Sequence, residues 1–294
     1  MRVVLFVAIL AIVGFVFKKD ITRLVAGEAE TKQGQKVEES EHSAYSSGKL
    51  TVKEKWDLPA LLKEVSGIAY MDDRRFACIQ DEAGTVYIYN ISTGKIEKEI
   101  PFTGVGDFED VVLIGTTAYI VRSDGKLFEV DINSGRNSVK EYTTSLTAKH
   151  NVEGLCFDKK NNRLLMAIKD EEPGKVDYKG IYAFNLEQKK FIKEPVYKIN
   201  LDNDVLTSSG GKKQKGIKPS AIGIHPVSGD IYITDGPRSR LLVMDDAGNP
   251  KMIYELGKEF EQPEGIAFSP EGEIFISNEG TKQPPNITRI EIKQ

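Results

Sequence analysis

The chain has 294 residues, 40% of them hydrophobic, and a formal net charge of −4 at pH 7. This length is sufficient for one closed domain with a substantial core. The basic residues are scattered, and together with the negative net charge they argue against nucleic acid as a partner. The two cysteines, Cys78 and Cys156, fall inside apolar runs. We therefore expect buried free thiols; a disulfide or a reactive thiol is the alternative.

The N-terminus predicts a membrane anchor. Residues 3–17 are apolar without interruption, and Lys18 and Lys19 follow directly. As a helix this run would extend about 22 Å, less than the roughly 30 Å of a hydrocarbon core. Snorkelling lysines would compensate, so we favour an uncleaved anchor over residues 1–27. A cleaved export signal is the alternative. Either way, we expect the rest of the chain on the exported side, held at the cell membrane or, after cleavage, secreted.

Residues 28–48 are polar and rich in Glu, Ser, Gln and Lys. They contain too little apolar surface to fold alone, so we expect a flexible tether. Residues 49–294 then form the folded domain, which we expect to be a monomer.

A five-residue sequence motif, here called the phrase, recurs in this domain. Each copy begins with a small or acidic polar residue and continues into a short apolar run, which a turn connects to a second β-rich run. The copies begin at Ser66, Glu109, Glu153, Ser220 and Glu264, so they are 43, 44, 67 and 44 residues apart. A period near 44 built from short strands is typical of a β-propeller.

The repeats predict an all-β fold, a five-bladed β-propeller of four-stranded antiparallel blades. Two insertions, residues 170–180 and 200–218, account for the long spacing. Six blades is the alternative, if residues 200–218 contain strands. The last repeat supplies only three strands, and residues 49–58 have no phrase of their own. We therefore expect residues 49–58 to be the outer strand of the last blade and to close the ring.

Carboxylates should gather at one mouth of the ring. The phrases begin, and the second strands end, on the same face, here called the upper face, which also receives both insertions. Oxygen ligands without paired histidines or cysteines favour a hard ion, and irregular geometry favours calcium over magnesium. The same acids could instead only bind neighbouring amides or cap turns. The candidate metal ligands are Glu109, Glu153, Glu264, Asp170, Asp235 and Asn278.

Catalytic signals are weak. His150, just before Glu153, is the one histidine placed for acid–base work, although a lone histidine is more often structural. His42 and His225 are expected to be solvated. The chain has no Gly-x-Ser-x-Gly elbow, no phosphate-binding glycine loop and no His-x-x-x-His pair.

Four segments resemble the SdiA-regulated family of bacterial propellers. They are Gly67–Tyr70, Phe108–Val111, Val152–Leu155 and Pro263–Ala267, and the resemblance extends from about residue 48 to the C-terminus. It implies a five-bladed propeller, distantly related to NHL-repeat propellers, with a calcium site and an exported or membrane-held location. The resemblance does not say which glutamate would bind the ion. Because two phrases begin with serine, we expect an asymmetric site.

Three functions are compatible with these observations. The first is a membrane-tethered calcium-binding propeller that binds a small ligand or a protein at its upper face, without chemistry of its own. The second is a metal-dependent hydrolase of a lactone, ester or phosphoester, with a carboxylate or His150 as base. The third is a purely structural scaffold, in which the acids serve blade packing.

Overall fold

The computed structural model describes residues 49–172, 174, 176–207 and 216–293. The chain divides into two units, Met1–His42 and Ser43–Gln294, and all described residues belong to the second. The predicted anchor and tether, with His42, lie outside the described residues. Within the described ranges, no helix is long and apolar enough to cross a membrane.

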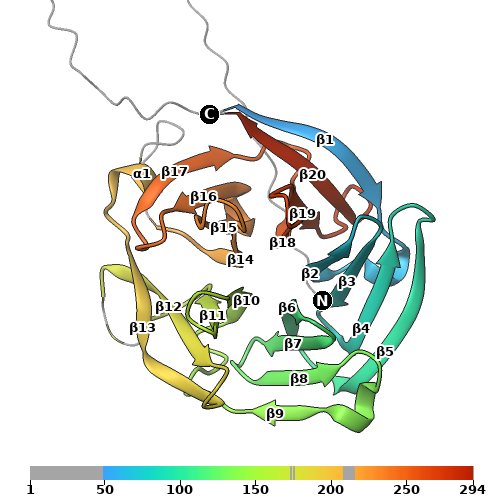
Figure 1. Cartoon of the computed structure of the whole chain (residues 1–294). Coiled ribbons are helices and arrows are strands. Elements are labelled where there is room, and N and C mark those ends of the chain that lie inside the picture. The colour runs from blue at the N-terminus through green and yellow to red at the C-terminus, as the bar shows by residue number, and fades with distance from the viewer. Residues whose placement is uncertain (1–48, 173, 175, 208–215, 294) are drawn as a thin grey trace, which may run out of the picture. The chain divides into compact units, whose positions relative to one another are not determined.

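Five four-stranded antiparallel sheets surround a central axis, which confirms the predicted five-bladed propeller (Figure 1). Blade 1 contains β2 (Val65–Asp72), β3 (Arg75–Gln80), β4 (Ala83–Asn90) and β5 (Lys95–Val105). Blade 2 contains β6 (Phe108–Ile114), β7 (Thr117–Arg122), β8 (Leu127–Asp131) and β9 (Lys140–Tyr142). Blade 3 contains β10 (Val152–Asp158), β11 (Arg163–Ile168), β12 (Tyr178–Asn185) and β13 (Lys190–Asn200).

Blade 4 contains β14 (Pro219–Ile224), β15 (Ile231–Asp235), β16 (Arg240–Met244) and β17 (Pro250–Glu255). Blade 5 contains β18 (Pro263–Phe268), β19 (Ile274–Asn278), β20 (Asn286–Lys293) and β1 (Lys49–Asp57). The insertion before blade 4 holds the short helix α1 (Asp204–Thr207) and no strand among its described residues. The six-bladed alternative is therefore not what the chain adopts. Single 3-10 turns occur at Ala60–Leu62, Gly135–Ser138 and Gly236–Arg238.

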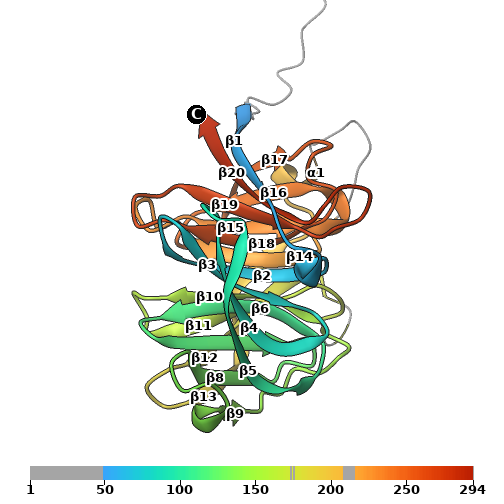
Figure 2. The ribbon, with the colours of Figure 1, turned by 90° about the vertical axis from the view of Figure 1, so that its right-hand side faces the viewer.

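The ring closes through the first strand, as predicted. β1 pairs with β20 from Lys49 opposite Lys293 to Asp57 opposite Asn286, with one irregularity between Val52 and Glu54. The antiparallel pairing places the start of β1 beside the end of β20, which the side view shows (Figure 2). Closure gives the last blade its fourth strand, so no inner strand of that blade is left as an open edge.

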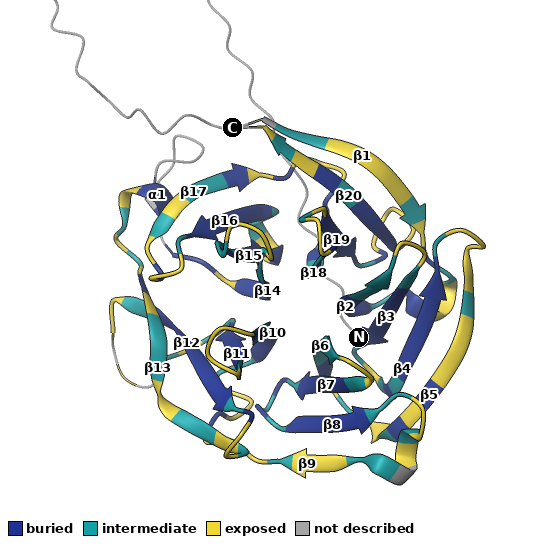
Figure 3. Ribbon diagram, viewed as in Figure 1, coloured by how far each residue is buried: buried dark blue, intermediate teal, exposed yellow. Residues whose placement is uncertain are grey.

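The core is divided among the blade interfaces. Five clusters of buried side chains each combine residues of two neighbouring blades. Inner and middle strands are mostly buried, whereas the outer strands β5 and β13 consist mainly of exposed and half-buried residues (Figure 3). Because both faces of each blade are covered, strands such as Arg240–Met244 are buried at every position. Each fully buried aliphatic side chain contributes roughly 1.5–3 kcal/mol.

Close packing of the innermost strands explains the glycine at the second position of three phrases. A Cβ atom at Gly67 would lie 2.6 Å from the Cα atom of Asp110 in the next blade. At Gly154 it would lie 2.9 Å from the backbone nitrogen of Ile222. These approaches exclude any side chain, so the glycines serve packing around the axis.

Both cysteines are free and buried, as predicted. Cys78 lies in β3 and Cys156 in β10. Burial raises the pKa of both thiols well above the ordinary value. A thiol that stays protonated is a poor nucleophile, so these residues act as small apolar side chains.

Candidate acidic site at the upper mouth

The upper face is the face on which the innermost strands β2, β6, β10, β14 and β18 begin. Antiparallel pairing brings the ends of β3, β7, β11, β15 and β19 to this face. A cavity of about 170 Å³ opens there. It is lined by Glu64, Val65, Ser66, Asp81, Asp107, Glu109, Glu153, Lys169, Gln262, Glu264 and Glu279. Seven carboxylates thus face one basic side chain, and the three phrase-initial glutamates are among them.

Burial and mutual repulsion make these glutamates hold protons strongly. Burial, then the neighbouring carboxylates Glu153 and Asp107, raise the pKa of Glu109 far above its ordinary value. Burial likewise raises the pKa of Glu264 to about 7, although the ammonium of Lys169 opposes the shift. The site therefore carries more carboxylates than its own positive charge can neutralise.

Lys169 supplies that positive charge. Its Nζ atom lies 2.7 Å from Oε2 of Glu153, and Nδ2 of Asn151 donates to Oε1 of Glu153 at 2.7 Å. Burial alone would lower the pKa of Lys169, but the carboxylates of Glu153, Glu264 and Glu109 raise it by more. The net pKa lies above the ordinary value, so the side chain stays a charged ammonium. Although burial raises the pKa of Glu153 too, we assign the negative charge to Glu153, which holds the direct ion pair. The excess protons then belong to Glu109 and Glu264.

Lys169, Asp81, Gln262 and Glu279 line the cavity but were not among the predicted metal ligands. Asp81 has a buried Oδ1 atom with no hydrogen-bond partner among the described residues, and burial raises its pKa to about 6. Gln262 donates to Oε2 of Glu279 at 2.7 Å. Asp81 and Glu279 directly follow the last residues of β3 and β19. This shared position in the repeat is the sequence feature that could have identified them as lining residues.

Three of the predicted ligands do not line the cavity. Asp170 pairs with Lys218 at 3.1 Å, and its side chain is 41% exposed. Asn278 is buried and donates to Oδ1 of Asn286 at 3.0 Å. Each is next to a residue that does line the cavity, Lys169 or Glu279. Because successive side chains of an extended chain point in opposite directions, a one-residue error moves the side chain away from the mouth.

Asp235 is the third of these ligands. It is fully buried, and its Oδ2 atom lies 2.6 Å from Arg240 and 3.1 Å from Arg238. Two guanidinium groups already neutralise this carboxylate. It ends β15 on the upper face, as predicted, but it lies outside the cavity lining and is held by these two guanidinium groups.

The predicted acid–base candidate His150 also lies outside the cavity. Its Nδ1 atom accepts a hydrogen bond from the backbone N–H of Thr147 at 2.9 Å, which closes a local turn. His225 was expected to be solvated, but it is not fully exposed. It is half-buried against Tyr232 and Phe268, with ring centroids 5.8 and 5.3 Å away.

Inter-blade hydrogen bonds hold the mouth in shape. Ser66 Oγ donates to the carbonyl of Phe108 at 2.7 Å, and Ser220 Oγ donates to that of Pro263 at 2.5 Å. Each acceptor directly precedes a phrase-initial glutamate, so the two serines position Glu109 and Glu264. In these two repeats, a serine takes the place of the glutamate because its hydroxyl bridges to the neighbouring blade.

Asp110 supports the mouth from below. It is buried, and its carboxylate accepts hydrogen bonds from the backbone N–H groups of Val111 at 2.8 Å and Leu155 at 2.7 Å. It occupies the phrase position that is glycine in three other repeats. Burial raises the pKa of Asp110 well above its ordinary value. The carboxyl therefore links blades 2 and 3 directly beneath Glu109 and Glu153.

Calcium can be tested against these side chains. The donors are carboxylate and amide oxygens, which hard cations prefer, and Asp81 Oδ1 is buried without a partner. However, no three His, Cys, Asp or Glu side chains of the described ranges are grouped closely enough to hold a metal ion. The chemistry fits calcium, whereas a closed ligand set would require the carboxylates to move inward and Lys169 to release Glu153.

Comparison with known proteins agrees with the fold. Among solved structures, glutaminyl cyclase from Myxococcus xanthus has a TM-score of 0.56 at 14% identity, covering 83% of this chain and 96% of that chain. A chain of a mitotic checkpoint complex has a TM-score of 0.50 at 10% identity, covering 93% and 99%. At these identities the similarity shows the fold alone. No curated protein sequence matches the chain. The profile of the SdiA-regulated family matches residues 42–286, and the chain therefore belongs to this family.

Proposed function

We propose that the upper mouth is a cation-binding site at which the propeller binds a ligand or a protein partner, without chemistry of its own. The observation that carries this proposal is the excess of carboxylates over ammonium groups in one cavity. Raised pKa values at Glu109 and Glu264 mean that, without a bound cation, these side chains take up protons and so relieve the repulsion. A cation would relieve the same repulsion and would compete with those protons.

Calcium is the ion we propose. Glu109, Glu153 and Glu264 would hold it with Asp81, because these side chains offer only oxygen. When bound, the ion would neutralise the carboxylates and offer an open position to an oxygen atom of a ligand. The protein's own contribution is the shape of the mouth, which the two serine bridges and Asp110 maintain. When no metal ion is bound, the ammonium of Lys169 would supply the positive charge among these carboxylates.

The hydrolase alternative gains no specific support at the mouth. The one hydroxyl among the described lining residues, that of Ser66, donates to a backbone carbonyl, and His150 serves its own turn. Glutaminyl cyclase and this chain share the fold, at 14% identity. We therefore propose binding and assign no reaction.

We also propose that the propeller is held at the membrane on the exported side. The apolar run of residues 3–17, with two lysines directly after it, supports this location. The full chain should remain with the membrane fraction after alkaline carbonate extraction, and a protease added to intact cells or spheroplasts should cleave it. Release by carbonate would indicate cleavage of the N-terminal segment or its absence from the bilayer.

The calcium proposal is tested by measuring metal content and thermal melting of the purified full chain. Stoichiometric calcium, with a lower melting temperature after chelation, would support it. Glu153→Gln should abolish the calcium-dependent part of the melting temperature. Asp170→Asn, outside the cavity, should leave it intact. A protein without metal, whose melt is indifferent to added calcium, would overturn the calcium site and favour the structural scaffold.

A further inference from the structure

A larger cavity lies between blades 4 and 5, far from the acidic mouth. It has a volume of about 900 Å³ and opens at the lower face, where the turns between first and second strands lie. We call it the blade 4–5 groove. Its apolar floor comes from both blades: Tyr232, Val243, Met252, Tyr254, Ile274, Ile290 and Ile292. This volume is typical of pockets that enclose a small organic ligand.

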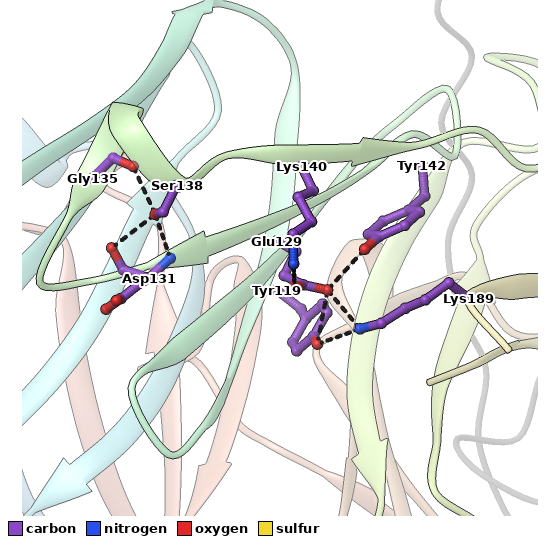
Figure 4. A network of polar contacts seen from close by, with 8 residues as sticks. All are labelled: Tyr119, Glu129, Asp131, Gly135, Ser138, Lys140, Tyr142 and Lys189. Carbon is purple, nitrogen blue, oxygen red and sulfur yellow. Dashed lines mark hydrogen bonds and ion pairs between the residues drawn. The ribbon is translucent and has the colours of Figure 1, made fainter. Parts of the chain in front are cut away.

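The equivalent position between blades 2 and 3 is filled. Glu129 of blade 2 is buried and accepts hydrogen bonds from Tyr119 and Tyr142 (Figure 4). Lys189 reaches across from blade 3, and its Nζ atom lies 2.6 Å from Oε2 of Glu129. The same ammonium lies 5.2 Å from the ring centroid of Tyr119. This group of side chains closes the gap between the two blades.

Aromatic rings fill two further interfaces. Between blades 1 and 2, the rings of Phe102, Phe108 and Phe128 pack with centroids 5.2 to 5.7 Å apart. Between blades 5 and 1, the ring of Phe275 lies 5.0 Å from Phe76 and 5.8 Å from Tyr70.

Polar contacts close the interface between blades 3 and 4. Lys160 pairs with Asp246 at 3.2 Å, and the Tyr197 hydroxyl donates to the backbone carbonyl of Asp246 at 3.3 Å. Side chains of both blades thus meet across each of these four interfaces.

The rims of the blade 4–5 groove behave differently, because their charged groups pair within their own blade. Lys251 pairs with Asp230 at 2.9 Å within blade 4. Lys53 pairs with Glu291 at 2.6 Å within blade 5. Among the described residues, the one side-chain hydrogen bond across this side of the groove is between His225 Nε2 and the carbonyl of Gly272, at 3.1 Å. The rings of His225 and Tyr232 also meet Phe268 of the innermost strand β18, with centroids 5.3 and 5.4 Å away. Phe268 does not line the groove, so these ring contacts close the inner side of the interface and leave the groove on its outer side.

We infer that the blade 4–5 groove binds the acyl chain of a neutral or zwitterionic lipid. Tyr232, Met252 and Ile292 are half-buried and offer apolar surface from both sheets, above the buried Val243, Tyr254, Ile274 and Ile290. Burying each methylene of a ligand against this surface is favourable by the hydrophobic effect. The floor strands β15, β16, β19 and β20 pair on both sides within their own sheets, so among the floor strands a peptide could add backbone hydrogen bonds only at the edge strand β17.

The charge of the rim favours a head group without net charge. Three basic and four acidic side chains line the groove, and they alternate as ion pairs along both rims. A bare anion or cation would therefore gain little, whereas a zwitterion can meet both signs. Val227, on the turn beside His225, is 70% exposed and offers apolar surface at the entrance. β1 also begins at this lower face.

The test measures uptake of N-phenyl-1-naphthylamine, a neutral dye that fluoresces in apolar surroundings, by the folded full chain. Met252→Trp should fill the floor, whereas Met252→Leu conserves volume. Ile253→Trp is a matched control, because Ile253 is the next residue of β17 and packs on the opposite interface. All variants contain residues 1–48, so dye bound there contributes equally. Circular dichroism melts establish that each variant is folded.

We expect saturable uptake by the wild type and both controls, and at least tenfold weaker uptake by Met252→Trp. Monoacyl phosphocholines below their micelle-forming concentration should displace the dye, with binding roughly two- to fourfold tighter per added methylene. Should Met252→Trp not fold, Ser228→Trp at the exposed rim replaces it. Unchanged uptake by the filled variant, no saturable uptake by the wild type, or displacement independent of chain length would each overturn the inference.

Discussion

The acidic mouth makes the stability of the propeller depend on pH in a defined direction. The pKa of Glu264 is about 7 in the folded protein, compared with an ordinary value of 4.5. Between these values the folded protein binds more protons at Glu264 than the unfolded chain does. The free energy of unfolding therefore falls as the pH rises from 4.5 through 7.

The magnitude follows from the shift. At 1.36 kcal/mol per unit, ionising Glu264 in the folded protein costs about 3 kcal/mol. Contact with solvent in the cavity reduces this value, so we treat it as an upper value. Glu264→Gln replaces the carboxyl with a neutral group of the same shape and should remove the cost. For a domain of this size, the melting temperature at pH 8 should rise by roughly 3–10 °C.

The assay is a thermal melt of wild type and Glu264→Gln at pH 4 and pH 8, first in chelator and then with calcium. In chelator, the variant should be more stable at pH 8 and equal to the wild type at pH 4. Calcium should stabilise the wild type more at pH 8 than at pH 6, because fewer protons compete, and should stabilise the variant less. Glu255→Gln, on the exposed face of β17, is the matched control. A variant less stable than the wild type at pH 8 would refute the reasoning.

Two further predictions concern the blade interfaces. Burial would raise the pKa of Glu129, but hydrogen bonds from two lysines and Tyr142 lower it to about 2, so its stabilisation should be lost as the pH falls from 4.5 through 2. Lys189→Met should lower the free energy of unfolding by about 2 kcal/mol at pH 7 and make this acid transition shallower; an unchanged urea midpoint would contradict the role of the contact. Gly67→Ala should destabilise the propeller by about 2 kcal/mol or more, because its Cβ atom would overlap Asp110. Gly104→Ala, with nothing within 4 Å, is the control, and equal melting temperatures for the two variants would show that the close approach is not limiting.

Much of the architecture was predictable because a propeller repeats one local unit. The period of the phrases and the turns between short apolar runs predicted five blades, and the three-stranded last repeat predicted closure by residues 49–58. These features depend on strand length, turn chemistry and the pairing of strands that are close in sequence. The convergence of Glu109, Glu153 and Glu264 was also predictable, since radial repetition places equivalent positions around one axis.

The remaining details were decided by tertiary structure. Whether Lys169 or Asp170 faces the cavity depends on where β11 ends, and a difference of one residue reverses the direction of the side chain. Asp235 became an ion-pair partner because Arg240 is buried beside it. The blade 4–5 groove depends on which side chains cross each interface, and repeats with the same pattern fill their interfaces differently. The sequence by itself therefore determined the repeat and the ring, whereas long-range packing determined which charges meet and which gap stays open.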